Sequence, residues 1–184
     1  MRILTWDLEI KTPLEEVGGD WTRVRNGDAG ISVLAVRDNE TGRQHLYDTH
    51  TLDAAVDHLN EADLLVGFNS VGFDSCVLLG VTNRHLSVPH YDILAKIWEA
   101  LGTRQKGWKL DDVASRTIGL TKSGKGEYAT ALFAQGRFAE LHDYCMGDVH
   151  ITAALYNHIV VNGWVVGPEG DHLHLDQPGS EVLA

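Results

Sequence analysis

The chain has 184 residues, of which 43% are hydrophobic and 22% charged, so it is long enough for one globular domain with a sizeable core. No stretch approaches the roughly 18 apolar residues of a membrane-spanning helix, and Asp7 and Glu9 interrupt the apolar N-terminus too early for a signal peptide, so we expect a cytoplasmic protein without a membrane partner. The formal net charge of −11 excludes a chain that coats a nucleic-acid duplex with a basic surface.

The first half of the chain predicts four strands and two helices. Runs of β-branched and apolar residues favour strands at 2–10, 31–37, 44–47 and 63–68. Between the first two strands, residues 11–30 contain Pro13 and four glycines, which indicates a loop. An amphipathic helix is expected at 51–60, and Asn69 or Ser70 can cap a second helix that ends at Gly80.

The second half predicts helices at 91–101, 110–118 and 138–161, followed by a β-hairpin at 163–176. Strands that precede and alternate with helices in this way predict an α/β fold with a mixed sheet flanked by helices, in a single domain spanning 1–184. The two cysteines, Cys76 and Cys145, lie far apart in expected helices, so we interpret both as buried structural thiols.

Paired carboxylates lie on the first expected strand, in the tripeptide Asp7-Leu8-Glu9. Side chains two residues apart on a strand point to the same face, so Asp7 and Glu9 lie side by side, whereas Trp6 and Leu8 face the helices behind the sheet. Two like charges held this close repel each other unless a cation lies between them. Taken alone, the same pattern also fits an exposed strand end.

Two further acidic positions follow later in the chain. Asp74 ends the stretch GFNSVGFD, where a strand turns into a helix whose dipole favours an acid in its first turn. Tyr144 and Asp148 are four residues apart in the long expected helix, so the hydroxyl and the carboxylate lie on one helical face. Because that helix is apolar on nearly all sides, an unpaired carboxylate at Asp148 would be costly there.

These three blocks, in this order, resemble the Exo I, Exo II and Exo III motifs of the DEDD exonuclease superfamily, which has a ribonuclease H-like fold. The tyrosine four residues before the last aspartate resembles the tyrosine branch, which includes ribonuclease D and the proofreading domains of family B DNA polymerases. The histidine branch would carry histidine where this chain has Asp143. The resemblance covers about residues 1–160.

The resemblance implies a 3′–5′ exonuclease that uses two Mg²⁺ or Mn²⁺ ions to hydrolyse single-stranded nucleic acid from its 3′ end. In this reading Asp7 bridges both ions, Glu9 and Asp148 complete the ion on the nucleophile's side, and Asp74 acts on the other ion. Tyr144 would orient the attacking water, since a phenol with a pKa near 10 is a poor general base at neutral pH. DNA is the favoured substrate, RNA stays open, and a polymerase, helicase or repair partner is unspecified.

Substrate contacts are expected from a basic segment and from residues beside the acids. Between Arg104 and Lys125 the chain has six cationic residues and two aspartates, which suits a local grip on a short polyanion. Aromatic stacking on bases tolerates any sequence. The candidates for substrate binding are Leu8, Asn69, Phe73, Trp108, Lys122 and Lys125. For Trp108, a packing role between its flanking helices is the alternative.

The sequence leaves three alternatives to an exonuclease. The first, a phosphate-binding loop at 119–125, lacks the Ser or Thr that binds magnesium, because Gly126 stands there, and a helix rather than a strand is expected before it. The second, a zinc site, is weak, since only His172 and His174 lie close together in sequence. The third, a catalytically silent nucleic-acid-binding module on the same fold, is opposed by the presence of all four carboxylates and the tyrosine.

Overall fold

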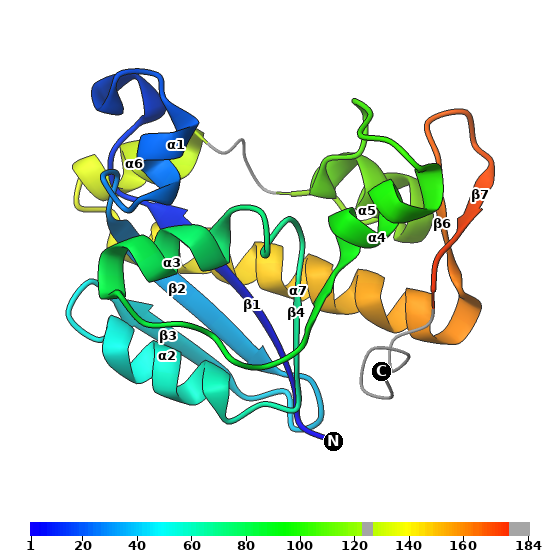
Figure 1. Cartoon of the computed structure of the whole chain (residues 1–184), viewed down its shortest axis with the longest axis horizontal. Coiled ribbons are helices and arrows are strands. Elements are labelled where there is room, and N and C mark those ends of the chain that lie inside the picture. Colours follow the sequence, from blue (N-terminus) through cyan, green and yellow to red (C-terminus); the bar gives the residue numbers. More distant parts are fainter. Residues whose placement is uncertain (123–126, 177–184) are drawn as a thin grey trace.

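A five-stranded mixed sheet forms the centre of the molecule (Figure 1). The computed structural model describes residues 1–122 and 127–176. The sheet order is β3-β2-β1-β4-β5, and β1 pairs antiparallel with β2 and parallel with β4. The strands are β1 (Ile3–Ile10), β2 (Ile31–Asp38), β3 (Gln44–Asp48), β4 (Leu64–Gly67) and β5 (His90–Asp92). The predicted α/β fold with a mixed sheet between helices is confirmed.

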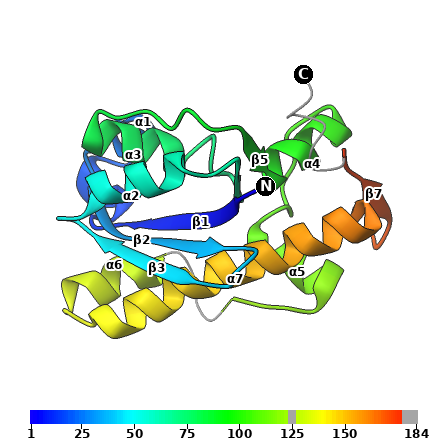
Figure 2. The ribbon, with the colours of Figure 1, turned by 90° about the horizontal axis from the view of Figure 1, so that it is seen from below.

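Helices cover both faces of the sheet, so the molecule has three layers (Figure 2). One face carries α1 (Trp21–Arg25), α2 (Leu52–Asn60) and α3 (Asp74–Thr82). The other face carries α6 (Glu127–Ala134) and α7 (Phe138–Asn162), and α5 (Leu110–Ile118) packs on α7. The remaining elements are η1 (Leu14–Val17), α4 (Ile93–Leu101), and a terminal hairpin of β6 (Trp164–Val166) and β7 (His172–His174).

The central strand β1 shows why the two helical layers have different chemistry. Leu4, Trp6 and Leu8 point to one side and pack in a core cluster with residues of α2 and α3, as their alternation predicts. The intervening side chains face α7, where the Cys145 thiol lies 3.6 Å from the backbone carbonyl oxygen of Asp7. The alternation therefore separates an apolar face of β1 from a face that carries the acids.

Two predicted helix boundaries differ from the structure. The segment expected as one helix at 91–101 begins with the short strand β5, and the helix α4 starts only at Ile93. The second helix continues past Gly80 to Thr82, and Asn83 in the left-handed conformation ends it. Gly80 is required for a close approach instead, because a Cβ there would lie 2.3 Å from the carbonyl carbon of Asn26.

Some structured segments were not predicted. The expected loop 11–30 contains η1 and α1, and α6 was not predicted although Ala129, Leu132 and Phe133 repeat at helical spacing. Both cysteines lie in helices as expected, but only Cys145 is buried, whereas Cys76 is partly exposed. Among the helices of the described ranges, even the 25-residue α7 lacks the long apolar stretch needed to cross a membrane.

Candidate metal centre

Three carboxylates from two elements meet between the sheet and α7. Asp7 and Glu9 project from the same face of β1, and Asp148 comes from the middle of α7. One ligand oxygen from each lies within 4.8 Å of the others, and this is the group suited to a metal ion among residues 1–122 and 127–176. Hard carboxylate oxygens at this separation match the ligand preference of Mg²⁺ and Mn²⁺. The structure therefore brings together three of the four predicted metal ligands.

Asp74, the fourth predicted ligand, is hydrogen-bonded to β1 from α3, which covers the other face of the sheet. It is the first residue of α3 and is buried, and its Oδ1 accepts a hydrogen bond of 3.3 Å from the backbone N–H of Leu8. Leu8 lies between Asp7 and Glu9 in sequence, so this bond places Asp74 beside the pair. The charge of Asp7 contributes to a raised pKa at Asp74, after burial as the main cause.

The turn that delivers Asp74 is organised by Asp92, a residue that the sequence analysis missed. The Asp92 carboxylate accepts hydrogen bonds from the backbone N–H groups of Asn69 (2.8 Å) and Val71 (2.9 Å). The same side chain caps α4 by accepting from the N–H of Leu94. An acid directly before an apolar helix was the available signal. Asp92 therefore ties the end of β5 to the loop that leads into α3.

The carboxylates are held in a state that favours bound protons or a bound cation. Burial and, after it, the negative charge of Asp148 raise the pKa of Asp7 to about 7, although the charge of Lys122 acts in the opposite direction. Burial, followed by the charge of Asp7, also places the pKa of Glu9 well above its usual range. At neutral pH the ionised cluster is therefore destabilising by itself, and a divalent cation would relieve that repulsion.

This electrostatic strain predicts a pH-dependent gain in stability when Asp7 is neutralised. Between the unfolded pKa near 3.8 and the folded pKa of about 7, the folded carboxyl holds a proton that the unfolded chain has lost, so stability falls as pH rises through this window. In the presence of a chelator at pH 8, the free energy of unfolding of Asp7→Asn should be higher than that of the wild type by at least about 1 kcal/mol, or roughly 2–4 °C in Tm. This difference in stability should disappear toward pH 4.

The matched control is Asp143→Asn, which neutralises an exposed aspartate on α7. Its Tm difference from the wild type should change little over the same pH range. Saturating magnesium at pH 8 should raise the Tm of the wild type and leave that of Asp7→Asn nearly unchanged. A wild type that is more stable than Asp7→Asn in chelator at pH 8 would contradict this account of the cluster.

Lys122 lies inside the acidic centre. Its ammonium forms an ion pair with the Asp148 carboxylate and is 5.8 Å from the centre of the Tyr144 ring. The backbone N–H of Lys122 is fixed by a 2.7 Å hydrogen bond to Asp111 at the start of α5. Burial lowers the pKa of Lys122, but the charges of Asp148 and Asp7 outweigh it and hold the pKa above its usual range. A permanent cation therefore faces the carboxylates.

Tyr144 places an unpaired hydroxyl beside the same groups. The side chain is buried on α7, and its hydroxyl oxygen has no hydrogen-bond partner among the residues that the structure describes. Burial and the charge of Glu9 raise the pKa of Tyr144, so the phenol is a neutral donor near pH 7, although Lys122 acts in the opposite direction. A buried polar atom without a protein partner fits a site that holds solvent or a hydrated ion.

The predicted substrate-binding residues have different surroundings. Phe73 is partly buried directly before Asp74, and Asn69 adopts a left-handed backbone conformation (φ 63°) in the turn fixed by Asp92. Leu8 and Trp108 are both core residues, with 4% and 5% of their surface exposed. Other side chains therefore already cover the surface of each that a base would contact. Lys125 lies outside the described residues.

Trp108 illustrates why a basic loop is a weak guide to a stacking site. Its indole packs in the cluster formed by α4, α5 and α7, and the guanidinium of Arg116 lies 5.7 Å from its ring. The packing interpretation is therefore favoured, and the stacking role of Trp108 has no support from its position. The phosphate-contact role expected for Lys122 stays a prediction, since its ammonium is paired with Asp148 here.

The histidines expected in the tail hairpin do not form a metal group with other ligands in the described ranges. His172 stacks on Trp164 with ring centres 3.7 Å apart and planes within 5° of each other. The exposed His174 pairs in register with Trp164 across the hairpin. These contacts account for the two histidines as parts of the β6–β7 ribbon.

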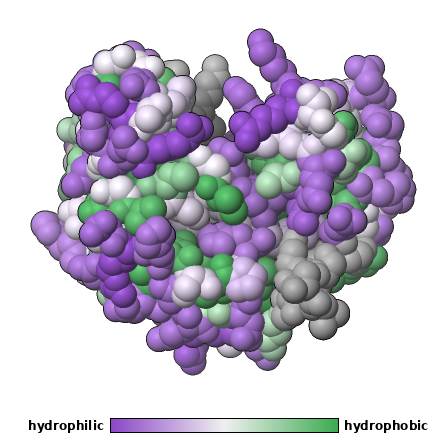
Figure 3. Space-filling model, in the orientation of Figure 1, coloured by the Kyte–Doolittle hydropathy of each residue, from purple (hydrophilic) through white to green (hydrophobic). Residues whose placement is uncertain are grey.

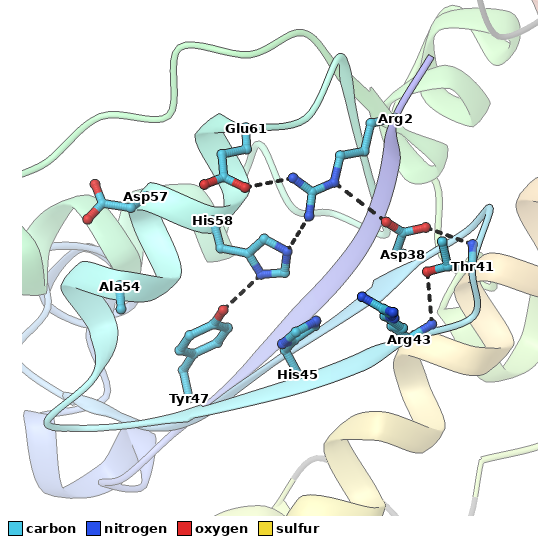
Figure 4. Close-up of a pocket in the computed structure, with 10 residues that line it drawn as sticks. All are labelled: Arg2, Asp38, Thr41, Arg43, His45, Tyr47, Ala54, Asp57, His58 and Glu61. Atoms are coloured by element: carbon cyan, nitrogen blue, oxygen red, sulfur yellow. Dashed lines mark hydrogen bonds and ion pairs between the residues drawn. The ribbon is translucent and has the colours of Figure 1, made fainter.

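A separate polar pocket of about 390 Å³ lies between β3 and α2 (Figure 4). His58 is held there by Arg2 at 2.9 Å and by the Tyr47 hydroxyl at 2.8 Å, and burial lowers its pKa. Arg2 is in turn paired with Glu61 at 2.7 Å and with Asp38 at 3.5 Å. Because its central groups satisfy one another, this pocket holds the edge strand to α2 and is unrelated to the acidic centre.

Comparison with known proteins supports the fold. No protein-family model matches the chain, and a search of curated proteins returned no match. Among solved structures, the chain is similar to the family B DNA polymerase from the hyperthermophilic archaeon Pyrobaculum calidifontis, with a TM-score of 0.63 and 19% sequence identity. The shared feature is the fold. The alignment covers 86% of this chain and 24% of the polymerase chain, so the chain spans about a quarter of that protein's length.

Proposed function

We propose that the chain is a metal-dependent 3′–5′ exonuclease that hydrolyses phosphodiester bonds at the 3′ end of single-stranded nucleic acid. The observation that carries this proposal is the convergence of Asp7, Glu9 and Asp148 within 4.8 Å. Asp74 joins the same strand through Leu8, and the arrangement lies on a fold similar to part of a family B DNA polymerase. The buried hydroxyl of Tyr144 beside these groups favours the tyrosine branch of the superfamily.

The acidic side chains of β1, α3 and α7 would hold two Mg²⁺ or Mn²⁺ ions. Such a pair activates a water nucleophile at neutral pH and stabilises the leaving 3′ oxygen of an in-line displacement. Asp7 is the central residue, because one of its oxygens lies within 4.8 Å of ligand oxygens of Glu9 and Asp148, and the neighbouring Leu8 N–H is hydrogen-bonded to Asp74. Asp7 therefore would contact both ions, whereas Asp148 and Glu9 would hold one and Asp74 the other.

Tyr144 and Lys122 would act on the reacting groups rather than as ligands. The neutral Tyr144 phenol would donate or accept a hydrogen bond with the attacking water and hold it in line with the phosphorus atom. The Lys122 ammonium, paired with Asp148 in the protein alone, would shift to a phosphate oxygen when the carboxylate takes a divalent cation. The hydrogen bond that anchors the Lys122 backbone keeps the ammonium within reach of the site.

Two features support the proposed substrate: the charge distribution of the chain and its similarity to a DNA polymerase structure. An acidic protein with one basic segment suits a short single strand that is gripped near its end. DNA is favoured because the structural neighbour is a DNA polymerase. The class of partner that this substrate implies is a polymerase, helicase or repair protein that exposes such ends.

The test uses single-stranded DNA and RNA oligonucleotides labelled at either end. With magnesium or manganese, the 3′ label should be released as a mononucleotide, while 5′-labelled products shorten one nucleotide at a time. Chelator should stop both, because the four carboxylates then hold no cation. Binding without metal-dependent release would instead support a catalytically silent module and overturn the enzyme assignment.

A further inference from the structure

An exposed tryptophan stands next to the aromatic residue that precedes Asp74. Half of the Trp21 surface (50%) is exposed, and its ring meets the ring of Phe73 edge to face, with centres 5.8 Å apart and an interplanar angle of 76°. Phe73 is partly buried and is the N-cap residue of α3, whose first residue is Asp74. Trp21 therefore continues the aromatic surface of Phe73 outward, next to the turn that delivers Asp74.

The excursion that carries Trp21 is fixed to α3 rather than loosely attached. The Arg25 side chain donates a 2.9 Å hydrogen bond to the backbone carbonyl of Gly72, in the turn before Phe73. The backbones of α1 and α3 also touch where Asn26 and Gly27 meet Gly80, a contact that leaves no room for a Cβ. Figure 1 shows the resulting position of α1 directly beside α3. The exposed indole is therefore held in a defined place.

A second exposed ring lies against an aromatic residue of the site. Tyr128, at the start of α6, is 38% exposed and meets the ring of Tyr144 edge to face at 5.9 Å. Figure 3 shows a notch in the upper outline of the molecule, between the part that carries α1 and the part that carries α4 and α5. Exposed aromatic rings that contact Phe73 and Tyr144 are suited to bases, whose faces all stack regardless of sequence.

We propose that Trp21 is a substrate-positioning residue that stacks on the base of one of the last two nucleotides of a single strand. This inference rests on the proposed function and adds a subsite from the excursion 11–30 to it. Phe73 supports the indole through the edge-to-face contact, and half of the Trp21 surface stays exposed and available to a base. The interaction recognises the presence of a base and an unpaired end, and it discriminates little among the four bases.

The experiment compares Trp21→Ala, Trp21→Phe and the control Phe138→Ala. Phe138 is 51% exposed and meets Phe133 edge to face at 5.8 Å, so it matches Trp21 in exposure and in ring contact at the first turn of α7. Single-turnover cleavage is measured over a range of concentrations of two oligonucleotides. One is an ordinary single strand, and the other lacks the bases of its two 3′-terminal nucleotides.

For the ordinary strand, Trp21→Ala should raise the half-saturating concentration about tenfold and change the rate at saturation by less than threefold. Trp21→Phe should recover most of that affinity, and Phe138→Ala should resemble the wild type. On the abasic strand, Trp21→Ala and the wild type should be alike. Equal half-saturation on the ordinary strand, or an equal loss on both strands, would overturn the stacking role. A wild type with no metal-dependent cleavage would instead refute the proposed function.

Discussion

Asp7→Ala should lower the single-turnover rate of 3′-end cleavage by at least about a thousandfold, which corresponds to about 4 kcal/mol in the activation barrier. Asp7 is the carboxylate that lies on β1 between the Asp148 and Asp74 sides of the centre, so its loss would disturb both ions. The measurement is release of a 3′-labelled mononucleotide from a saturating oligonucleotide in magnesium.

The control for this experiment is Asp143→Ala, which removes an exposed carboxylate from α7 without touching β1. It should retain the wild-type rate within about twofold, as most exposed substitutions do. Because neutralising Asp7 also relieves repulsion within the cluster, the inactive Asp7→Ala protein should remain folded in chelator. An Asp7→Ala protein, free of contaminating nuclease, that cleaves at the wild-type rate would refute the metal centre.

Tyr144→Phe should lower the rate at saturation by roughly tenfold to a hundredfold, since one positioning hydrogen bond is worth on the order of 1–3 kcal/mol. The phenyl ring still fills its place in the cluster with Cys145 and Val149 and still meets Tyr128, so substrate affinity should change little. The neutral phenol also predicts that the rate will not show a tyrosine ionisation near pH 7. Single-turnover cleavage over substrate concentration separates these effects.

Tyr47→Phe is the matched control, because it removes a hydroxyl that bonds His58 in the pocket between β3 and α2. It can reduce stability but should not reduce the cleavage rate. Tyr144→His should fail to restore activity, since the histidine branch places its histidine five residues before the last aspartate, at the position of Asp143. A Tyr144→Phe rate within about twofold of the wild type would make Tyr144 a core residue only.

Much of this protein follows from local periodicity. The two-residue repeat of a strand places Asp7 and Glu9 on one face of β1 and Leu8 on the other, and the structure confirms this division. The helical repeat likewise places Tyr144 and Asp148 on one face of α7. These relations span only a few residues, and the backbone geometry of the element determines them. The sequence was therefore sufficient to predict which side chains lie side by side on β1 and on α7, and to predict the fold class.

Contacts between distant segments depended on how the layers pack. No local pattern brings the ammonium of Lys122 to Asp148, because that contact requires the segment after α5 to cross beside α7. The same holds for Asp92, whose carboxylate organises a turn more than 20 residues earlier in the chain. Three residues of strand are too few to show a period, so the sequence alone predicts that the residues of β5 belong to the following helix.

Sequence by itself was sufficient to select the residues that we propose carry the chemistry, because Asp7, Glu9, Asp74, Tyr144 and Asp148 are marked by type and spacing. The tertiary structure alone decided what surrounds them. It buried Trp108 in the core and left Trp21 exposed beside Phe73, although both tryptophans lie in segments that sequence described as loops. The physical reason is that the burial of a side chain depends on which other elements pack against it, and those elements are distant in sequence.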